Sequence, residues 1–154
     1  MYPHDVPILR QELLRTLSRR QIERNYLFVS RVAMAPCALK RTDSDISLGA
    51  RSHPQHLRFS FDAITRARAH HLRCPDGVVS SWAAAAYAGL PFWVDNAQTT
   101  LLVREGRRRS TSPLFPHRLT ARSHIPTSQP DPEFPSLHVM QSAAASAYCL
   151  RDIY

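Results

Sequence analysis

The sequence predicts an α+β protein, with a small helical unit at the N-terminus and a larger unit of helices and strands after it. Three stretches support this prediction. Apolar residues recur at helical spacing near the N-terminus, a run of small residues ends at Gly89 and Pro91, and a β-branched apolar run covers 99–103. The composition, 44% hydrophobic and 21% charged, is typical of a folded protein.

Two short helices are expected at the N-terminal end of the chain. The first covers Val6 to Leu17, and its apolar positions are Ile8, Leu9, Leu13 and Leu14. The second begins at Ser18 and carries Gln21 three residues later, which is a capping-box arrangement. Ile22 and Tyr26 are expected to face inward from this second helix.

Three arginines, Arg19, Arg20 and Arg24, lie on the outer face or in the first turn of that second helix. A tight junction between two helices, followed by basic residues at the start of the second, is the layout of helix-turn-helix DNA-binding proteins. The alternative is that these arginines form only the solvated side of an amphipathic helix. The segment 27–34 is expected to be a strand.

The stretch from Cys74 to Arg109 forms the centre of the predicted larger unit. A turn at Asp76-Gly77 precedes a helix that begins at Ser80-Ser81 and runs through alanines to Gly89. A strand over 99–103 follows after a short loop. A second basic cluster stands directly on the end of that strand, at Arg104, Arg107, Arg108 and Arg109.

Three further elements complete the expected fold. A helix from Phe59 to Leu72, with Asp62 near its start, should pack beside the 80–88 helix. A strand is expected over 114–119 and a helix over 137–154, whereas 40–58 and most of 110–136 are expected to be linker or loop.

The charge balance points to an anionic partner. The formal net charge is +8 and the pI about 10.2, and Lys40 is the only lysine among the basic residues. Arginine forks match phosphates and guanine edges, so double-stranded DNA is the expected partner. The alternative is an arginine content that reflects GC-rich coding alone.

Three segments resemble a known family. Val78 to Pro91 reads VVSSWAAAAYAGLP and resembles the V-L-S-H-x-S-A-A-x-L-H-G-L-P segment of AbiEi-type antitoxins and related actinobacterial proteins with an N-terminal winged helix. The string LSRRQIER, residues 17–24, is similar to the second helix of that winged-helix domain. In the family a Gly-rich hairpin with a basic wing tip comes next, and this chain lacks both of its glycines and that tip. The segment 137–154 resembles the L-x-V-x-x-P-x-x-A-x-x-D-x-L-R element that follows the basic strands in the family.

The resemblance implies a degenerate winged helix-turn-helix over 1–50 and an antitoxin-like α/β domain over 55–154. It also implies a DNA-binding, antitoxin-like transcriptional regulator of the type IV toxin-antitoxin kind, with a cognate toxin as a second partner. The alternative is a non-catalytic remnant of a longer nuclease-like protein that acts as a binding or protein-interaction module.

The sequence favours no enzyme, cofactor or metal site. It has no phosphate-binding glycine loop, and Asp131 and Glu133 lie among prolines, where loop carboxylates are easily exposed. His70, His71 and Cys74 lack the spacing of a zinc site and are interpreted as ordinary helix-end residues. The three cysteines are too few for a disulfide framework. With no secretory segment and no apolar run of about 18 residues, a cytoplasmic protein without membrane contact is expected.

Overall fold

The computed structural model describes residues 6–36, 61–90, 97–104, 116–120 and 125–141. Within these ranges four helices accompany a three-stranded and a five-stranded sheet. The predicted α+β class is therefore confirmed. The expected domain boundary, between residues 50 and 55, lies outside the described residues.

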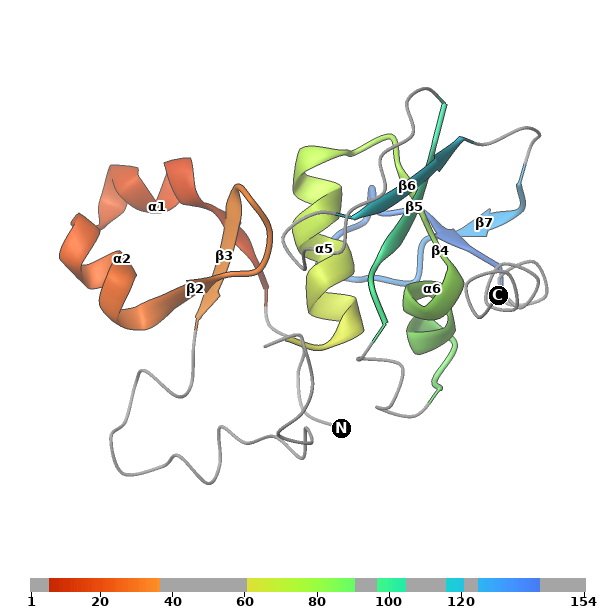
Figure 1. Ribbon diagram of the computed structural model, residues 1–154, viewed down its shortest axis with the longest axis horizontal. Coiled ribbons are helices and arrows are strands. Elements are labelled where there is room, and N and C mark those ends of the chain that lie inside the picture. The colour runs from red at the N-terminus through yellow and green to blue at the C-terminus, as the bar shows by residue number, and fades with distance from the viewer. Residues whose placement is uncertain (1–5, 37–60, 91–96, 105–115, 121–124, 142–154) are drawn as a thin grey trace.

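The N-terminal unit is a helix pair packed against a small antiparallel sheet (Figure 1). Its elements are β1 (Ile8–Leu9), α1 (Arg10–Thr16), α2 (Arg19–Asn25), β2 (Tyr26–Phe28) and β3 (Ala33–Pro36). The strand order is β1-β3-β2, and both neighbouring pairs are antiparallel. Leu13, Ile22 and Met34 are buried together between the helices and the sheet.

Two boundaries in this unit differ from the prediction. The first helix does not cover 6–17, because Ile8 and Leu9 pair with Met34 and Ala33 as a strand, and the helix begins only at Arg10. The expected single strand over 27–34 is a hairpin, in which residues 29–32 make the turn between β2 and β3. Pairing across the sheet has overridden the local pattern in both places.

The second unit is built on a mixed five-stranded sheet. Its strands are β4 (Val78–Ser80), β5 (Thr100–Val103), β6 (His117–Thr120), β7 (Thr127–Ser128) and β8 (Val139–Met140). Their order is β6-β5-β4-β8-β7. The pairs β4–β8 and β5–β6 are parallel, whereas β4–β5 and β7–β8 are antiparallel.

Several predictions for this unit are confirmed and one is wrong. The strand at 99–103 is β5, and a strand over 117–120 lies beside it as expected. The helix predicted over 137–154 does not begin at residue 137, because β8 occupies 139–140 and Val139 pairs with Val79. The remainder of that predicted helix, 142–154, lies outside the described residues.

Two helices pack against each other as the sequence predicted, although the first begins at Ala63, later than the predicted Phe59. The helix α5 (Ala63–Arg73) begins where the Asp62 carboxylate accepts from the backbone N–H of Thr65 at 2.8 Å. The helix α6 (Ser81–Tyr87) ends before Gly89, whose φ of 87° suits glycine alone without strain. The two helices are in direct contact.

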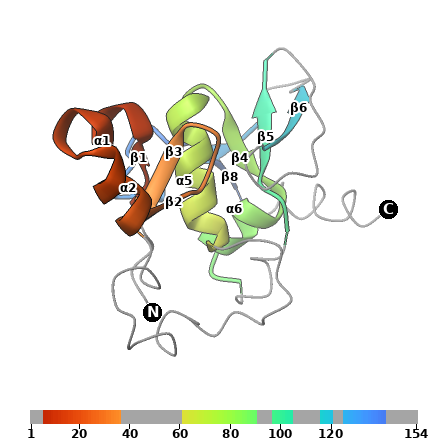
Figure 2. The same ribbon diagram turned by 60° about the vertical axis from the view of Figure 1, so that its left-hand side comes forward.

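The helix α5 joins the two units, because it lies between the small sheet and the large one in both views (Figure 1, Figure 2). One side of α5 contributes Ala67 to the core of the five-stranded sheet. Its other side contributes Ala69 to a cluster that holds Val29, Ala33, Ala35 and Phe61. A burial that covers both faces of one helix fixes the N-terminal unit against the rest of the chain.

Candidate nucleic-acid interface

The helix α2 directs two of its arginines away from the protein. Ile22 is only 3% exposed and points into the small core, whereas Arg20 and Arg24 are both exposed. These arginines stand two residues before and two residues after Ile22, which places them about 160° from it around the helix axis. Arg19 is also exposed, but it is only about 60° from the buried side. Arg20 and Arg24 therefore form the outermost ridge of α2.

The start of α2 is fixed by the capping box that the sequence predicted. The backbone N–H of Ser18 donates to Gln21 Oε1 at 2.9 Å, and the Ser18 hydroxyl donates to the same oxygen at 2.8 Å. The backbone N–H of Gln21 in turn donates to Ser18 Oγ at 3.4 Å. This closure fixes the first turn of the helix and, with it, the direction of its arginines.

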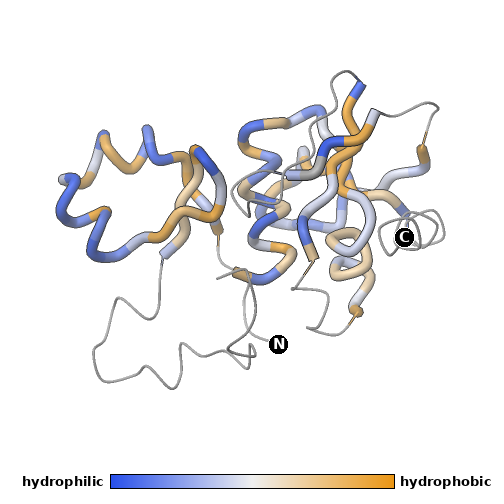
Figure 3. The backbone as a smooth tube through the Cα atoms, in the orientation of Figure 1, coloured by the Kyte–Doolittle hydropathy of each residue, from blue (hydrophilic) through white to orange (hydrophobic). Residues whose placement is uncertain are grey.

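The helix α1 extends the basic surface. Arg15 is exposed on the side of α1 opposite the buried Leu13, and Arg10 places its guanidinium 5.8 Å from the ring centroid of Phe28. Phe28 itself is 43% exposed. Most residues along α1 and α2 are hydrophilic, with a few hydrophobic residues between them (Figure 3). This end of the molecule thus combines several cations with an accessible surface.

The β2–β3 turn faces inward, toward α5. Val29 and Ser30 are 3% and 1% exposed. The Ser30 hydroxyl donates to the carbonyl of Ala69 at 3.5 Å and accepts from the backbone N–H of Ala33 at 3.1 Å. The turn is therefore held against α5 instead of projecting beside α2, and whether it is a wing remains a prediction.

Of the second predicted basic cluster the structure describes one residue, Arg104, and it does not lie beside the arginines of α2. Arg104 is exposed just after β5, and Arg107, Arg108 and Arg109 lie outside the described residues. In both views α5 stands between α2 and β5 (Figure 1, Figure 2). The structure therefore does not bring Arg104 together with the arginines of α2.

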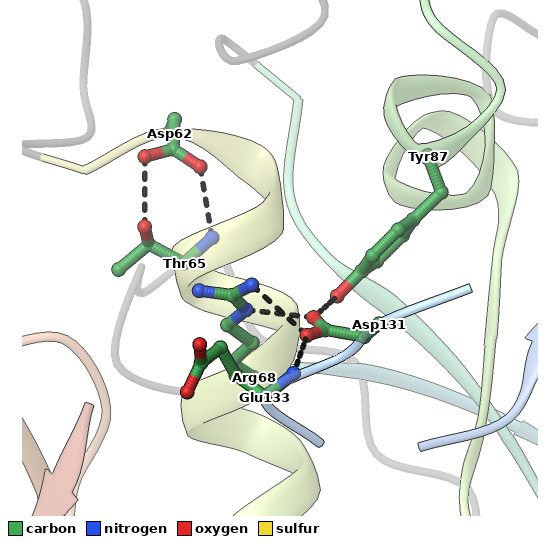
Figure 4. Close-up of polar contacts among 6 residues, drawn as sticks. All are labelled: Asp62, Thr65, Arg68, Tyr87, Asp131 and Glu133. Carbon is green, nitrogen blue, oxygen red and sulfur yellow. Dashed lines mark hydrogen bonds and ion pairs between the residues drawn. The ribbon is translucent and has the colours of Figure 1, made fainter. Parts of the chain in front are cut away.

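A buried polar network, which the sequence did not predict, joins α5, α6 and the segment before β8 (Figure 4). Arg68 Nε and one terminal nitrogen donate to the two oxygens of Asp131 at 2.6 and 2.9 Å. The Tyr87 hydroxyl donates to the same carboxylate at 2.5 Å, and the backbone N–H of Glu133 donates at 3.0 Å. The guanidinium of Arg68 also lies 5.6 Å from the ring centroid of Phe134.

Asp131 is therefore not the solvent-exposed loop carboxylate that the proline-rich surroundings suggested, because it is 2% exposed. Burial works to raise the pKa of Asp131, but the hydrogen bonds from Arg68 and Tyr87 outweigh it and lower that pKa below its usual value. Burial and the bond to Asp131 raise the pKa of Tyr87. For Arg68, burial acts to lower the pKa, yet Asp131 raises it. Each group is thus held in its usual charge state inside the protein.

The two histidines of α5 are core residues. His70 is 2% exposed, and burial, together with the nearby cations Arg66 and Arg118, lowers its pKa to about 3. His71 Nε2 lies 2.9 Å from Ser136 Oγ, and burial and His138 lower its pKa. Across the described residues, no group of three or more His, Cys, Asp or Glu side chains could hold a metal ion.

The structure also describes the start of α6 and one of the three cysteines. Ser80 precedes α6 as predicted, but its side chain makes no capping hydrogen bond, and its buried hydroxyl has no partner among the described residues. The following residue, Ser81, has a φ of 55°, a left-handed conformation that is rare for a residue other than glycine. Cys74 is a half-buried free thiol, whereas Cys37 and Cys149 lie outside the described residues.

In the ranges that the structure covers, no helix is long and apolar enough to cross a membrane. The chain matches no protein-family model, no curated protein and no solved structure. The resemblance to the antitoxin family therefore rests on the sequence segments that carry it.

Proposed function

We propose that this protein is a DNA-binding, antitoxin-like transcriptional regulator that contacts double-stranded DNA through α2. The observation that carries the proposal is the outer ridge of α2, where Arg20 and Arg24 are exposed opposite the buried Ile22. The net charge of +8 supports the same partner, because a basic surface attracts the phosphate backbone. The proposal includes a cytoplasmic location. It includes no catalytic activity, no cofactor, no bound metal and no contact with a membrane.

The order of elements supports a winged helix-turn-helix for this unit. Two helices joined at Leu17-Ser18 are followed by an antiparallel hairpin, and β1 completes the small sheet with the order β1-β3-β2. In helix-turn-helix proteins the second helix lies in the major groove and the first crosses the backbone. Here α2 is the recognition helix, and Arg15 of α1 contacts a phosphate. The hairpin turn is turned toward α5, so it adds no contact.

The basic run after β5 is proposed as a second phosphate site. It contains the exposed Arg104 and the three arginines at 107–109. Because β5 and α2 lie on different sides of α5, Arg104 contacts the backbone away from the base pairs that α2 reads. Such contacts position a protein on DNA without specifying sequence.

Titration of a fluorescent 20-base-pair duplex by anisotropy, over a series of KCl concentrations, tests the proposal. We expect the affinity to fall steeply with salt, by about 0.9 in the log–log slope for each neutralised phosphate. Arg20→Ala and Arg24→Ala should reduce the difference in affinity between a preferred duplex and random DNA. Arg107→Ala and Arg108→Ala should lower the affinity for both kinds of DNA about equally.

Arg73→Ala is the matched control, since it removes one exposed arginine from the end of α5. It should leave the preference for sequence unchanged. A flat salt response, or no duplex binding at low salt, would contradict DNA binding. It would favour the alternative of a remnant that acts as a protein-interaction module. A nucleotidyltransferase-type toxin encoded by an adjacent gene would identify the antitoxin-like role.

A further inference from the structure

The outer ridge of α2 has a spacing that suits two base pairs. Arg20 and Arg24 are four residues apart, which separates their Cα atoms by about 6 Å along the helix axis. Successive base pairs are about 3.4 Å apart, so this separation spans roughly two base-pair steps. No hydrogen bond or ion pair to another described residue engages either guanidinium. Both are therefore available to a ligand.

The side chains of α2 limit which bases this ridge can read. Recognition of adenine by glutamine needs the amide oxygen and nitrogen together. The oxygen of Gln21 already accepts two hydrogen bonds from Ser18, so this bidentate contact is not available without opening the cap. The contact that favours thymine is an apolar side chain against its methyl group. Every exposed side chain of α2 is polar, and its one buried apolar residue, Ile22, faces inward.

Guanine is the base that remains for the ridge. An arginine fork donates to the O6 and N7 atoms of guanine, and this is the commonest specific contact in the major groove. Arginine also keeps its charge at any pH at which the protein is folded. Because Arg20 and Arg24 form the outermost ridge of α2, they are the two side chains best placed to specify sequence.

We infer that α2 reads two guanines separated by one base pair, one through Arg20 and the other through Arg24. This inference rests on the proposed function and adds the identity and spacing of the bases to it. The partner is B-form DNA, because the deep and narrow major groove of duplex RNA does not admit a helix.

The experiment begins by selecting bound duplexes from a random DNA library with the full-length protein. We expect the enriched sequences to share two guanines with one base pair between them. Each selected guanine is then replaced by 7-deazaguanine, which lacks N7 and is otherwise unchanged in shape. Each replacement removes one of the two acceptors of a bidentate contact and should weaken wild-type binding by up to about tenfold.

The variants Arg20→Lys and Arg24→Lys keep the charge and remove the fork. Each should lower affinity for the selected duplex and should reduce the effect of one 7-deazaguanine replacement, a different one for each variant. Affinity for random DNA should change less than twofold. Arg15→Lys, on α1, is the matched control and should remain sensitive to both replacements. Circular dichroism spectra that overlay with wild type establish that the variants are folded.

Three results would overturn the inference. They are enriched sites without paired guanines, 7-deazaguanine effects that are the same in all the variants, and duplex RNA bound as tightly as the selected DNA. The first two, seen together with a steep salt dependence on duplex DNA, would leave the proposed DNA binding intact. Absence of duplex binding at low salt would overturn both proposals together.

Discussion

Replacing Asp131 by asparagine tests whether the buried network holds the second unit together. The side chains of Arg68 and Asp131 are 7% and 0% exposed, so water screens this ion pair very little. The Asp131→Asn change keeps the size of the side chain and removes its charge. It removes the Asp131 charge from beside the buried Arg68 guanidinium. It also turns one carboxylate oxygen into an amide donor, either Oδ2, which Arg68 and Tyr87 share, or Oδ1, which Arg68 and Glu133 share.

The expected loss in the free energy of unfolding is large. Removing one partner of a buried ion pair costs about 3–5 kcal/mol, because the other charge stays buried and unpaired. A domain is stable by only about 5–15 kcal/mol, so the loss is a large share of the free energy of unfolding. At about 2–4 °C per kcal/mol, the melting temperature should fall by roughly 6–20 °C.

Urea unfolding followed by far-UV circular dichroism measures this effect, and urea does not screen charge. Tyr87→Phe removes one hydroxyl and should cost about 1–2 kcal/mol. The double variant Arg68→Met with Asp131→Leu should recover much of the loss, because it leaves no unpaired charge. Asp76→Asn, in an exposed turn, is the control. If Asp131→Asn stays within about 0.5 kcal/mol of wild type, as a surface change does, the proposed role of the network is wrong.

Three further predictions concern stability and activity. Because the pKa of His70 is lowered from 6.5 to about 3, its contribution is complete above pH 6.5 and is lost as the pH falls toward 3. The free energy of unfolding should fall in this window by up to about 1.4 kcal/mol per pH unit for this group. His70→Leu should make the dependence of this free energy on pH flatter. Parallel curves for wild type and variant would exclude His70 as the source of the pH dependence. Ser18→Ala should lower the free energy of unfolding in urea by about 1 kcal/mol and weaken duplex binding. Ser18→Asp should retain most of the stability and most of the DNA affinity. Wild-type stability and affinity in Ser18→Ala would show that the cap has no role. Incubation of the purified protein with plasmid and Mg²⁺ or Mn²⁺ should leave the DNA intact, and metal-dependent nicking would support a nuclease instead.

The sequence predicted those elements whose signals are local. The capping box of α2 needs only Ser18 and Gln21, which stand three residues apart, and the structure contains both of its hydrogen bonds. Asp62 marks the start of α5 in the same way, and Gly89 marks the end of α6. The exposed positions of Arg20 and Arg24 also follow from the helical period alone, once Ile22 is placed inward.

The short strands could not be predicted, because each depends on a distant partner. Ile8 and Leu9 fit a helix by their spacing, but backbone pairing with β3 makes them a strand. Val139 likewise belongs to a strand because it pairs with Val79, whereas the alanines that follow it suggested a helix. Two-residue strands have almost no pattern of their own, so the sheet decides them.

Burial of charge was decided by the tertiary structure alone. Arg68 and Asp131 are 63 residues apart in sequence, and the prolines around Asp131 suggested an exposed loop. The one local signal was Arg68 between Ala67 and Ala69, on a helix whose small residues allow close packing. That signal could not name a counterion. A carboxylate is stable inside a protein only where donors converge on it, and the convergence of α5, α6 and the segment before β8 exists only after the chain has folded.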